Sequence, residues 1–399
     1  MISGSKIART SEHSPAPPVS ITGIGTVTGY GWSTTELWDG LLSGKPAAEL
    51  TGGLGPDGRD EGWVARVPSG GDPADGDSLF TRALRAACRE AVADAHARGW
   101  RPGARVGVLH ATVYPEVEAW RDFHRSDRSL HTARGFITQM PSTSIALMMK
   151  EFGFHGPSMS VAAMCSSGNA GLITAKMWLD AGVVDDVLLV STDLSLTPDT
   201  IESFIRMGVA VADTDPLDAS RPFQEGSRGF GLGEASVAMV VTNRPTDGRY
   251  ARMWGGAMTH DAFHVVSIDP SHEQVLGCVS SALESSGVAP EEIRYLNAHG
   301  PGTAQCTAAE TEVLARSFGD RPQVYSVKPL VGHCQGAAAG VEIAVAAMSY
   351  DAGVIPASPQ VAPGHPRLLD GVTTRQPGLT MKTSLGMGGH NAAVVLGEI

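Results

Sequence analysis

The chain has few cysteines and few basic residues for its length of 399 residues. Its five cysteines are scattered and form no Cys-x-x-Cys pair, which argues against a disulfide framework or a cysteine-based metal site. The same pattern fits a reducing compartment, so we expect a cytoplasmic protein. Lys and Arg number 30 against 42 Asp and Glu, a formal net charge of −12. A broad nucleic-acid-binding surface is therefore not expected.

Long hydrophobic runs are also missing. No apolar run approaches the length of a membrane span, so no membrane association is expected. Residues 1–18 are polar, contain Pro and Ser, and lack the apolar centre of a signal peptide. We expect these residues to form a disordered leader.

Strand-like and helix-like segments alternate along the rest of the chain. Strands are expected at 19–25, 105–112, 157–162, 186–192, 236–242, 249–258, 293–298, 323–327 and 391–396. Helices are expected at 33–43, 78–98, 143–152, 167–181, 271–286, 306–317 and 336–351. The alternation predicts a layered α/β fold, and the Gly-, Pro-, Asp- and Ser-rich segments 50–77 and 210–229 are expected to be loops.

Cys165 is the one cysteine in a setting suited to a nucleophile. An apolar segment, 158–163, leads into it, and a segment with helical spacing follows. At such a strand-to-helix turn, backbone N–H groups and the helix dipole are expected to lower a thiol pKa. A free cysteine is more often a small buried apolar residue, and this is how we interpret the other four: Cys88, Cys278, Cys306 and Cys334.

Two histidines follow expected strands far downstream of Cys165. His299 precedes a Gly-Pro-Gly turn, and His333 lies between an expected strand and an expected helix. Turns at strand ends are where open α/β sheets commonly build their sites. The histidines lie 134 (299 − 165) and 168 (333 − 165) residues beyond the cysteine, so the three side chains could meet only in the folded chain. A lone histidine in such a turn is more often structural.

A short repeat accompanies these turns. The helix expected after Cys165 ends in Asp-Ala-Gly at 180–182, and the helix expected after His333 ends in Asp-Ala-Gly at 351–353. The match is only three residues long, but it is consistent with a duplicated half.

These segments resemble the Cys-His-His elements of the β-ketoacyl synthases, the condensing enzymes of fatty-acid and polyketide synthesis. They are most similar to the elongating branch, which depends on acyl carrier protein. The likeness extends from about Val19 to Leu396 and includes the Gly-rich segments 229–234 and 383–391. It implies the thiolase fold, an α/β five-layer αβαβα sandwich of two similar halves, here 19–248 and 249–399. It also implies a homodimer with no cofactor and no metal.

The resemblance also implies a role for each site residue. Cys165 would hold the acyl group as a thioester, and the backbone N–H groups of Cys165 and Met387 would form the oxyanion hole. His299 and His333 would stabilise an enolate, while Lys328 and Glu310 would either support the histidines or form an ordinary surface ion pair. The substrate and the phosphopantetheine arm of the carrier protein are expected to contact six residues: Thr303, Pro301, Phe204, Phe230, Met387 and Gly388.

The chain departs from the family pattern at several of these positions. Pro301 replaces a threonine, Met387 replaces a common aromatic gate, Thr307 stands where Asp is common, and 110–115 is bulky where the family is often Gly-rich. We therefore expect a divergent, free-standing ketosynthase of specialised metabolism with weak malonyl condensation. Three alternatives remain: cyclisation or acyl transfer without malonyl decarboxylation, a non-catalytic partner subunit, and a thiolase or chain-initiating enzyme. The partner subunits usually lack the nucleophile, and the third class uses different motifs.

Overall fold

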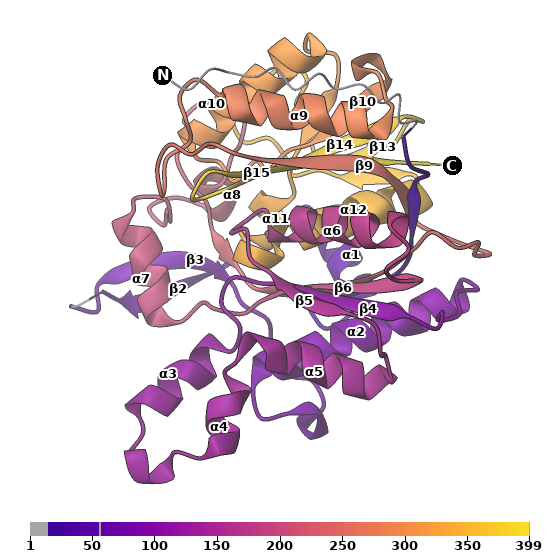
Figure 1. The fold of residues 1–399 in the computed structure, drawn as a ribbon. Helices are drawn as coiled ribbons and strands as arrows, with labels where there is room; N and C mark the ends of the chain where they lie inside the picture. Colours follow the sequence, from indigo (N-terminus) through magenta and orange to yellow (C-terminus); the bar gives the residue numbers. More distant parts are fainter. Residues whose placement is uncertain (1–14, 56, 399) are drawn as a thin grey trace, which may run out of the picture.

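The computed structural model describes residues 15–55 and 57–398 of the chain (Figure 1). The strands are β1 (Val19–Thr28), β2 (Glu49–Leu54), β3 (Asp60–Ala65), β4 (Val106–Ala111), β5 (Ser158–Val161), β6 (Asp186–Asp193), β7 (Leu232–Gly233), β8 (Ala235–Thr242), β9 (Ala251–His260), β10 (Ile293–Asn297), β11 (Gln323–Tyr325), β12 (Val354–Pro356), β13 (Val372–Thr374), β14 (Leu379–Gly386) and β15 (His390–Gly397). The helices are α1 (Thr34–Leu42), α2 (Leu79–Ala97), α3 (Val117–Arg125), α4 (Ala133–Thr138), α5 (Pro141–Phe152), α6 (Ser167–Asp180), α7 (Pro198–Arg206), α8 (Pro216–Ala219), α9 (Glu273–Ser286), α10 (Ala304–Glu312), α11 (Lys328–Val331) and α12 (Ala338–Ala352).

The molecule has five layers, as the family resemblance implied. Figure 1 shows α9 and α10 above one sheet, α6 and α12 between the two sheets, and α2 and α5 below the other sheet. One apolar core fills the space around α6 and α12, and two more lie beneath the outer helices. The central helices are buried on nearly every side, which explains why α12 is almost entirely apolar.

The two sheets repeat one topology. Ten strands are hydrogen-bonded in the order β11-β10-β14-β15-β9-β1-β8-β6-β4-β5. β1 and β9 pair only at Val19–Ile21, so this series divides into two groups of five. In each group the first strand in sequence, β1 or β9, lies at the junction, and β8 or β15 runs antiparallel to both of its neighbours. The repeated order supports a boundary between halves at residue 248, which stays a proposal.

The repeat includes the turns that begin the two central helices. Met164, before Cys165, has a φ of 48°, and Gln335, before Gly336, has a φ of 46°. These residues are 171 positions apart (335 − 164), the same separation as the Asp-Ala-Gly helix ends (353 − 182). The left-handed backbone is unfavourable for residues other than glycine, so its presence at both positions marks one turn conformation used twice.

All the strands and helices expected from the sequence are present; the expected loop at 50–77 was wrong in part, and the loop at 210–229 is confirmed apart from one short helix. Segment 50–77 contains most of β2 and all of β3, and 210–229 contains α8. β3 pairs with its sequence neighbour β2 and also with β7, more than 160 residues away, and local sequence does not encode the second pairing. The Gly-rich segment 383–391 is also mainly strand, since only 387–389 lie between β14 and β15.

Two further expectations concern the N-terminal residues and membrane-spanning helices. Residues 1–14 of the expected leader lie outside the described residues; 15–18 are described, and the Pro17 carbonyl accepts a 2.7 Å hydrogen bond from Lys176 Nζ. Within the described chain, no helix is both long and apolar enough to cross a membrane.

The crossing of α6 and α12 gives a test of the central layer. A Cβ at Gly168 would lie 2.4 Å from the backbone nitrogen of Gly340, so the helices would have to separate. We expect Gly168→Ala to destabilise the protein by about 1–3 kcal/mol in urea unfolding. Gly277→Ala is the control, because that glycine lies in α9 and a Cβ there would meet nothing within 4 Å, and alanine favours the helix. Equal stability of the two variants would contradict the close crossing.

Candidate active site

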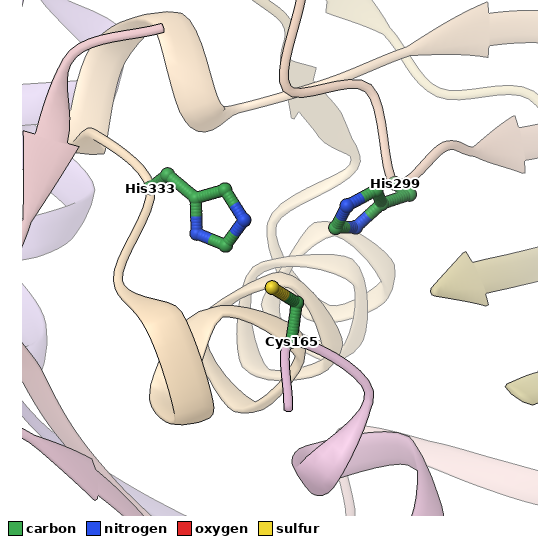
Figure 2. A group of neighbouring side chains, drawn as sticks. All are labelled: Cys165, His299 and His333. Atoms are coloured by element: carbon green, nitrogen blue, oxygen red, sulfur yellow. The ribbon is translucent and has the colours of Figure 1, made fainter. Parts of the chain in front are cut away.

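Cys165, His299 and His333 meet in one buried cluster (Figure 2). One side-chain atom of each, sulfur or ring nitrogen, lies within 4.8 Å of the others, and the residues are 5%, 2% and 3% exposed. Cys165 follows β5 and precedes α6, His299 follows β10, and His333 follows α11. The sequence did not predict α11, which places His333 after a helical turn rather than directly after a strand. The three predicted residues are thus brought together.

The turn that carries Cys165 is tied to the C-terminal half. Ser166 Oγ donates to the carbonyl oxygens of Ser384 (3.1 Å) and His390 (2.9 Å), which belong to β14 and β15. Within the turn, Ser167 Oγ accepts from the Ala163 N–H at 2.9 Å. These bonds hold the left-handed Met164 in place and fix the thiol against the β14–β15 hairpin.

The expectation of a lowered thiol pKa was wrong. Burial raises the pKa of Cys165 to about 11, although the charge of Lys328 and the N–H groups of Met387 and Cys165 act in the opposite direction. Desolvation of the thiolate therefore outweighs the helix dipole and the neighbouring donors. Both N–H groups expected in the oxyanion hole are nevertheless close enough to the sulfur to affect its ionisation.

Both histidines are neutral and have the same tautomer. Burial, together with the charge of Lys328, holds the pKa of each imidazole well below its usual range. His299 Nδ1 lies 3.3 Å from Lys328 Nζ, and His333 Nδ1 accepts from the Gln335 N–H at 3.1 Å. An ammonium and an amide N–H can only donate, so each Nδ1 is an acceptor and each Nε2 carries the proton. The site therefore holds two neutral N–H donors.

A buried charge network contacts His299 through Lys328. Lys328 Nζ donates to the His299 carbonyl and forms an ion pair with Glu342, and Glu342 also pairs with Lys382 Nζ at 2.7 Å. All three charged residues are at most 1% exposed, which rules out a surface ion pair for Lys328. Because a buried ammonium needs a compensating carboxylate, Glu342 is what allows Lys328 to face His299.

Glu310 supports the same histidine through the backbone. Its carboxylate accepts from the N–H groups of His299 (2.6 Å) and Gly300 (2.8 Å), and from Thr383 Oγ1 at 2.7 Å. The residue is fully buried, and burial raises its pKa. Glu310 thus fixes the turn rather than the ring, which is compatible with the expected supporting role.

The three clustered side chains also have the spacing of a metal site, but their protons oppose metal binding. A metal bound at Nε2 would require Nδ1 to carry the proton. In His299 that proton would point at the Lys328 ammonium, and in His333 it would point at the Gln335 N–H. The donors on Nδ1 therefore favour hydrogen-bond donation from Nε2 over ligation.

A cavity of about 640 Å³, counted to its open mouth, gives access to the three residues. Of the residues expected to contact substrate, five line it: Phe204, Phe230, Pro301, Thr303 and Met387. Phe230 packs against His333 with ring centroids 4.9 Å apart, and Thr303 Oγ1 caps α10 by accepting from the Cys306 N–H at 3.4 Å. Gly388 lies in the β14–β15 turn and does not line the cavity, so its contact with substrate stays a prediction.

Sequence reasoning missed several residues of the site. Glu342 and Lys382 were not identified, although Glu342 is the only charged side chain in the buried part of α12 and Lys382 the only one in β14, which was an available signal. Gln335 and Cys306 both line the cavity. Cys306 is buried as expected of an ordinary cysteine, and nothing in its local sequence indicated that it would face the site.

The thiol pKa gives a prediction for reactivity. Because the pKa of Cys165 is about 11, the fraction of thiolate increases throughout the neutral range. We expect alkylation of Cys165 by iodoacetamide to accelerate about tenfold per pH unit from pH 7 to 9, measured by peptide mapping. Cys165→Ala is the control for labelling elsewhere. A rate that levels off near pH 7 would mean that the thiol is already ionised there.

The charge network gives a prediction for stability. Glu342→Gln should lower the free energy of unfolding by about 3–5 kcal/mol at pH 7, because two buried ammoniums lose their carboxylate. Burial lowers the pKa of Lys382 to about 8, below its unfolded value. The folded state therefore binds fewer protons than the unfolded state in this range, and the loss should be smaller at pH 9 than at pH 7.

The control for this variant is Glu312→Gln. Glu312 lies 3.9 Å from Arg316 in a half-exposed pair, so its replacement should change stability by less than about 1 kcal/mol. The free energies of unfolding of both variants are measured by urea unfolding at pH 7 and pH 9. Similar effects of the two substitutions would argue against a charge network at the site.

Comparison with known proteins places this geometry in a family. The beta-ketoacyl synthase N-terminal domain matches residues 75–246, and the beta-ketoacyl synthase C-terminal domain matches residues 250–362. The tetracenomycin polyketide synthase ketoacyl synthase alpha subunit of Streptomyces glaucescens is 28% identical over 95% of this chain and 96% of its own length. The 3-oxoacyl-[acyl-carrier-protein] synthase 2 of Staphylococcus aureus strain COL is 29% identical over 79% of this chain and 81% of its own.

A solved structure has the same fold. It contains a type II polyketide synthase acyl carrier protein in complex with its ketosynthase bound to the hexaketide, and it superposes with a TM-score of 0.83 at 19% identity, over 97% of this chain and 100% of that chain. The two family matches together span well over half of the sequence and include all three clustered residues. The chain belongs to the β-ketoacyl synthase family and is a ketosynthase-type condensing enzyme with Cys165, His299 and His333 as its catalytic residues.

Proposed function

We propose that the enzyme forms carbon–carbon bonds on acyl groups delivered by an acyl carrier protein in specialised, polyketide- or fatty-acid-like biosynthesis. The observation that carries this proposal is the pair of neutral imidazoles whose Nδ1 atoms are both occupied. Two N–H donors beside a thiol suit a reaction in which negative charge develops on a thioester oxygen. An inert partner subunit would not need this arrangement.

The first step loads Cys165. Its thiolate attacks the carbonyl carbon of the carrier-bound thioester, and the oxyanion is stabilised by the N–H groups of Cys165 and Met387. The bond to the pantetheine sulfur then breaks, and that sulfur takes up a proton as it leaves. Neither histidine in its present tautomer can accept the thiol proton, so loading depends on the small thiolate fraction set by the raised pKa.

The second step joins the units. A malonyl thioester loses CO₂, and the electron pair of the broken bond forms an enolate whose oxygen accepts from Nε2–H of His299 and His333. The enolate carbon attacks the acyl carbonyl, the bond to sulfur breaks, and Cys165 is released beside a β-ketoacyl thioester. Because the imidazoles start neutral, they stabilise the enolate as hydrogen-bond donors and need not ionise.

One residue of the cavity wall, Pro301, favours a second candidate function. Pro301 has no N–H and no hydroxyl, while Thr303 Oγ1, which accepts from the Cys306 N–H, keeps its proton for one hydrogen bond. The pantetheine arm of a simple malonyl carrier thus finds fewer polar partners, each worth roughly 0.5–1.5 kcal/mol. This supports the alternative in which the enzyme cyclises or transfers a larger tethered chain without malonyl decarboxylation.

We also propose that the enzyme is a homodimer. β5 lies at one end of the ten-stranded order, with Ser158, Met159 and Ser160 exposed. An exposed strand edge in a stable protein is normally covered, and antiparallel pairing with a second copy of the same strand would cover it symmetrically.

The division of roles can be tested by timing the two steps separately. We expect Cys165→Ala to lose acyl loading, and His299→Ala and His333→Ala to slow condensation by about 10²–10³-fold while loading falls much less. Intact mass reports loading, and product and CO₂ release report condensation with malonyl carrier. Loss of loading in both histidine variants would contradict the assigned roles, and a new carbon–carbon bond without CO₂ would select the second candidate.

A further inference from the structure

Gln335 is a polar side chain at the reactive end of the cavity. It lines the same cavity as Cys165 and His333 and is 5% exposed. The nearby wall is mostly apolar, with Phe204, Phe230 and Leu385 among its members. A largely buried amide in such a place is unfavourable unless its polar atoms are paired.

The backbone of Gln335 is firmly fixed. Its φ of 46° repeats the turn that precedes Cys165, and its N–H donates to His333 Nδ1 at 3.1 Å. The following residue, Gly336, donates from its N–H to Asp193 Oδ2 at 3.1 Å. The amide is therefore presented on a rigid support, as a recognition group needs to be.

The side chain of Gln335 keeps unused hydrogen-bonding capacity. Nε2 donates to the His333 carbonyl at 3.2 Å, which uses one of its two hydrogens. Within the described part of the chain, no group donates to Gln335 Oε1 at hydrogen-bonding distance. One donor and one acceptor of the amide thus remain for a ligand.

A second polar group lies on the element beside Gln335. The buried Thr112 Oγ1 has no hydrogen-bond partner among the described residues. The backbone at Thr112 and Val113 packs so closely on Gly336 that a Cβ there would lie 2.7 Å from the Val113 nitrogen. Thr112 therefore follows β4 beside the turn that carries Gln335 and fixes that turn by packing, but it does not line the cavity.

We propose that Gln335 determines substrate specificity by binding an oxygen substituent, a hydroxyl or keto group, close to the thioester carbon of the acyl group. This inference rests on the proposed function, since it concerns the acyl group that Cys165 accepts. A hydroxyl can accept from Nε2 and donate to Oε1, whereas a hydrocarbon chain leaves both unpaired. A site built in this way disfavours the analogue that lacks the oxygen.

The test compares two acyl groups that differ by one oxygen. Butyryl and racemic 3-hydroxybutyryl pantetheine thioesters are incubated with the full-length enzyme, and acylation of Cys165 is timed by intact mass. We expect the hydroxylated group to load about three- to tenfold faster in the unmodified protein, the effect of one or two hydrogen bonds. Gln335→Met, which keeps length and flexibility, should abolish or reverse this ratio.

Gln305→Met is the matched control. Gln305 lines the same cavity, but its Oε1 accepts from the Ile268 N–H at 3.1 Å, so the variant should keep the preference. Equal loading of the two acyl groups by the unmodified enzyme, or a ratio that Gln335→Met leaves unchanged, overturns the role of Gln335. The first of these results is measured on the unmodified enzyme, so it does not depend on whether any variant folds. Failure of any acyl thioester to modify Cys165 would instead overturn the proposed function.

Discussion

The contact between Lys328 and His299 Nδ1 is the interaction on which the active site depends. It decides which nitrogen of His299 carries the proton and keeps the imidazole neutral. Lys328 can be buried at this point only because Glu342 neutralises it, and Glu342 is shared with Lys382 of β14. The chemistry of one ring is therefore set by side chains from α11, α12 and β14, none of which faces the substrate cavity.

The repeated turn shows how two similar halves came to hold different groups. In the N-terminal half, the residue after the left-handed position is Cys165, whose thiol faces the cavity. In the C-terminal half it is Gly336, where a side chain would collide with Val113 and whose N–H is used by Asp193. The second turn thus keeps its shape but carries no nucleophile. It contributes His333 from the residues just before it instead.

The sequence was sufficient for the features that depend on local pattern. Each of the turns that carry Cys165, His299 and His333 is by itself more often structural, and the three could be predicted because their segments together resemble the Cys-His-His elements of one family. Glu342 could not be assigned a partner, because Lys328 and Lys382 reach it from separate elements. β3 was missed although it pairs with its neighbour β2, because the local sequence shows neither that pairing nor the one with the distant β7. The direction of the Cys165 pKa shift was wrong because the sequence shows the helix that follows but not the depth of burial.

The raised pKa of the nucleophile has a consequence for the idle enzyme. Peroxides oxidise thiolates far faster than thiols, and Cys165 at neutral pH is almost entirely in the thiol form. The residue is also nearly sealed from solvent by the cavity wall. Before an acyl group is loaded, the Cys165 thiol therefore reacts slowly with oxidants. It is protected from the irreversible oxidation that readily damages exposed, low-pKa cysteines.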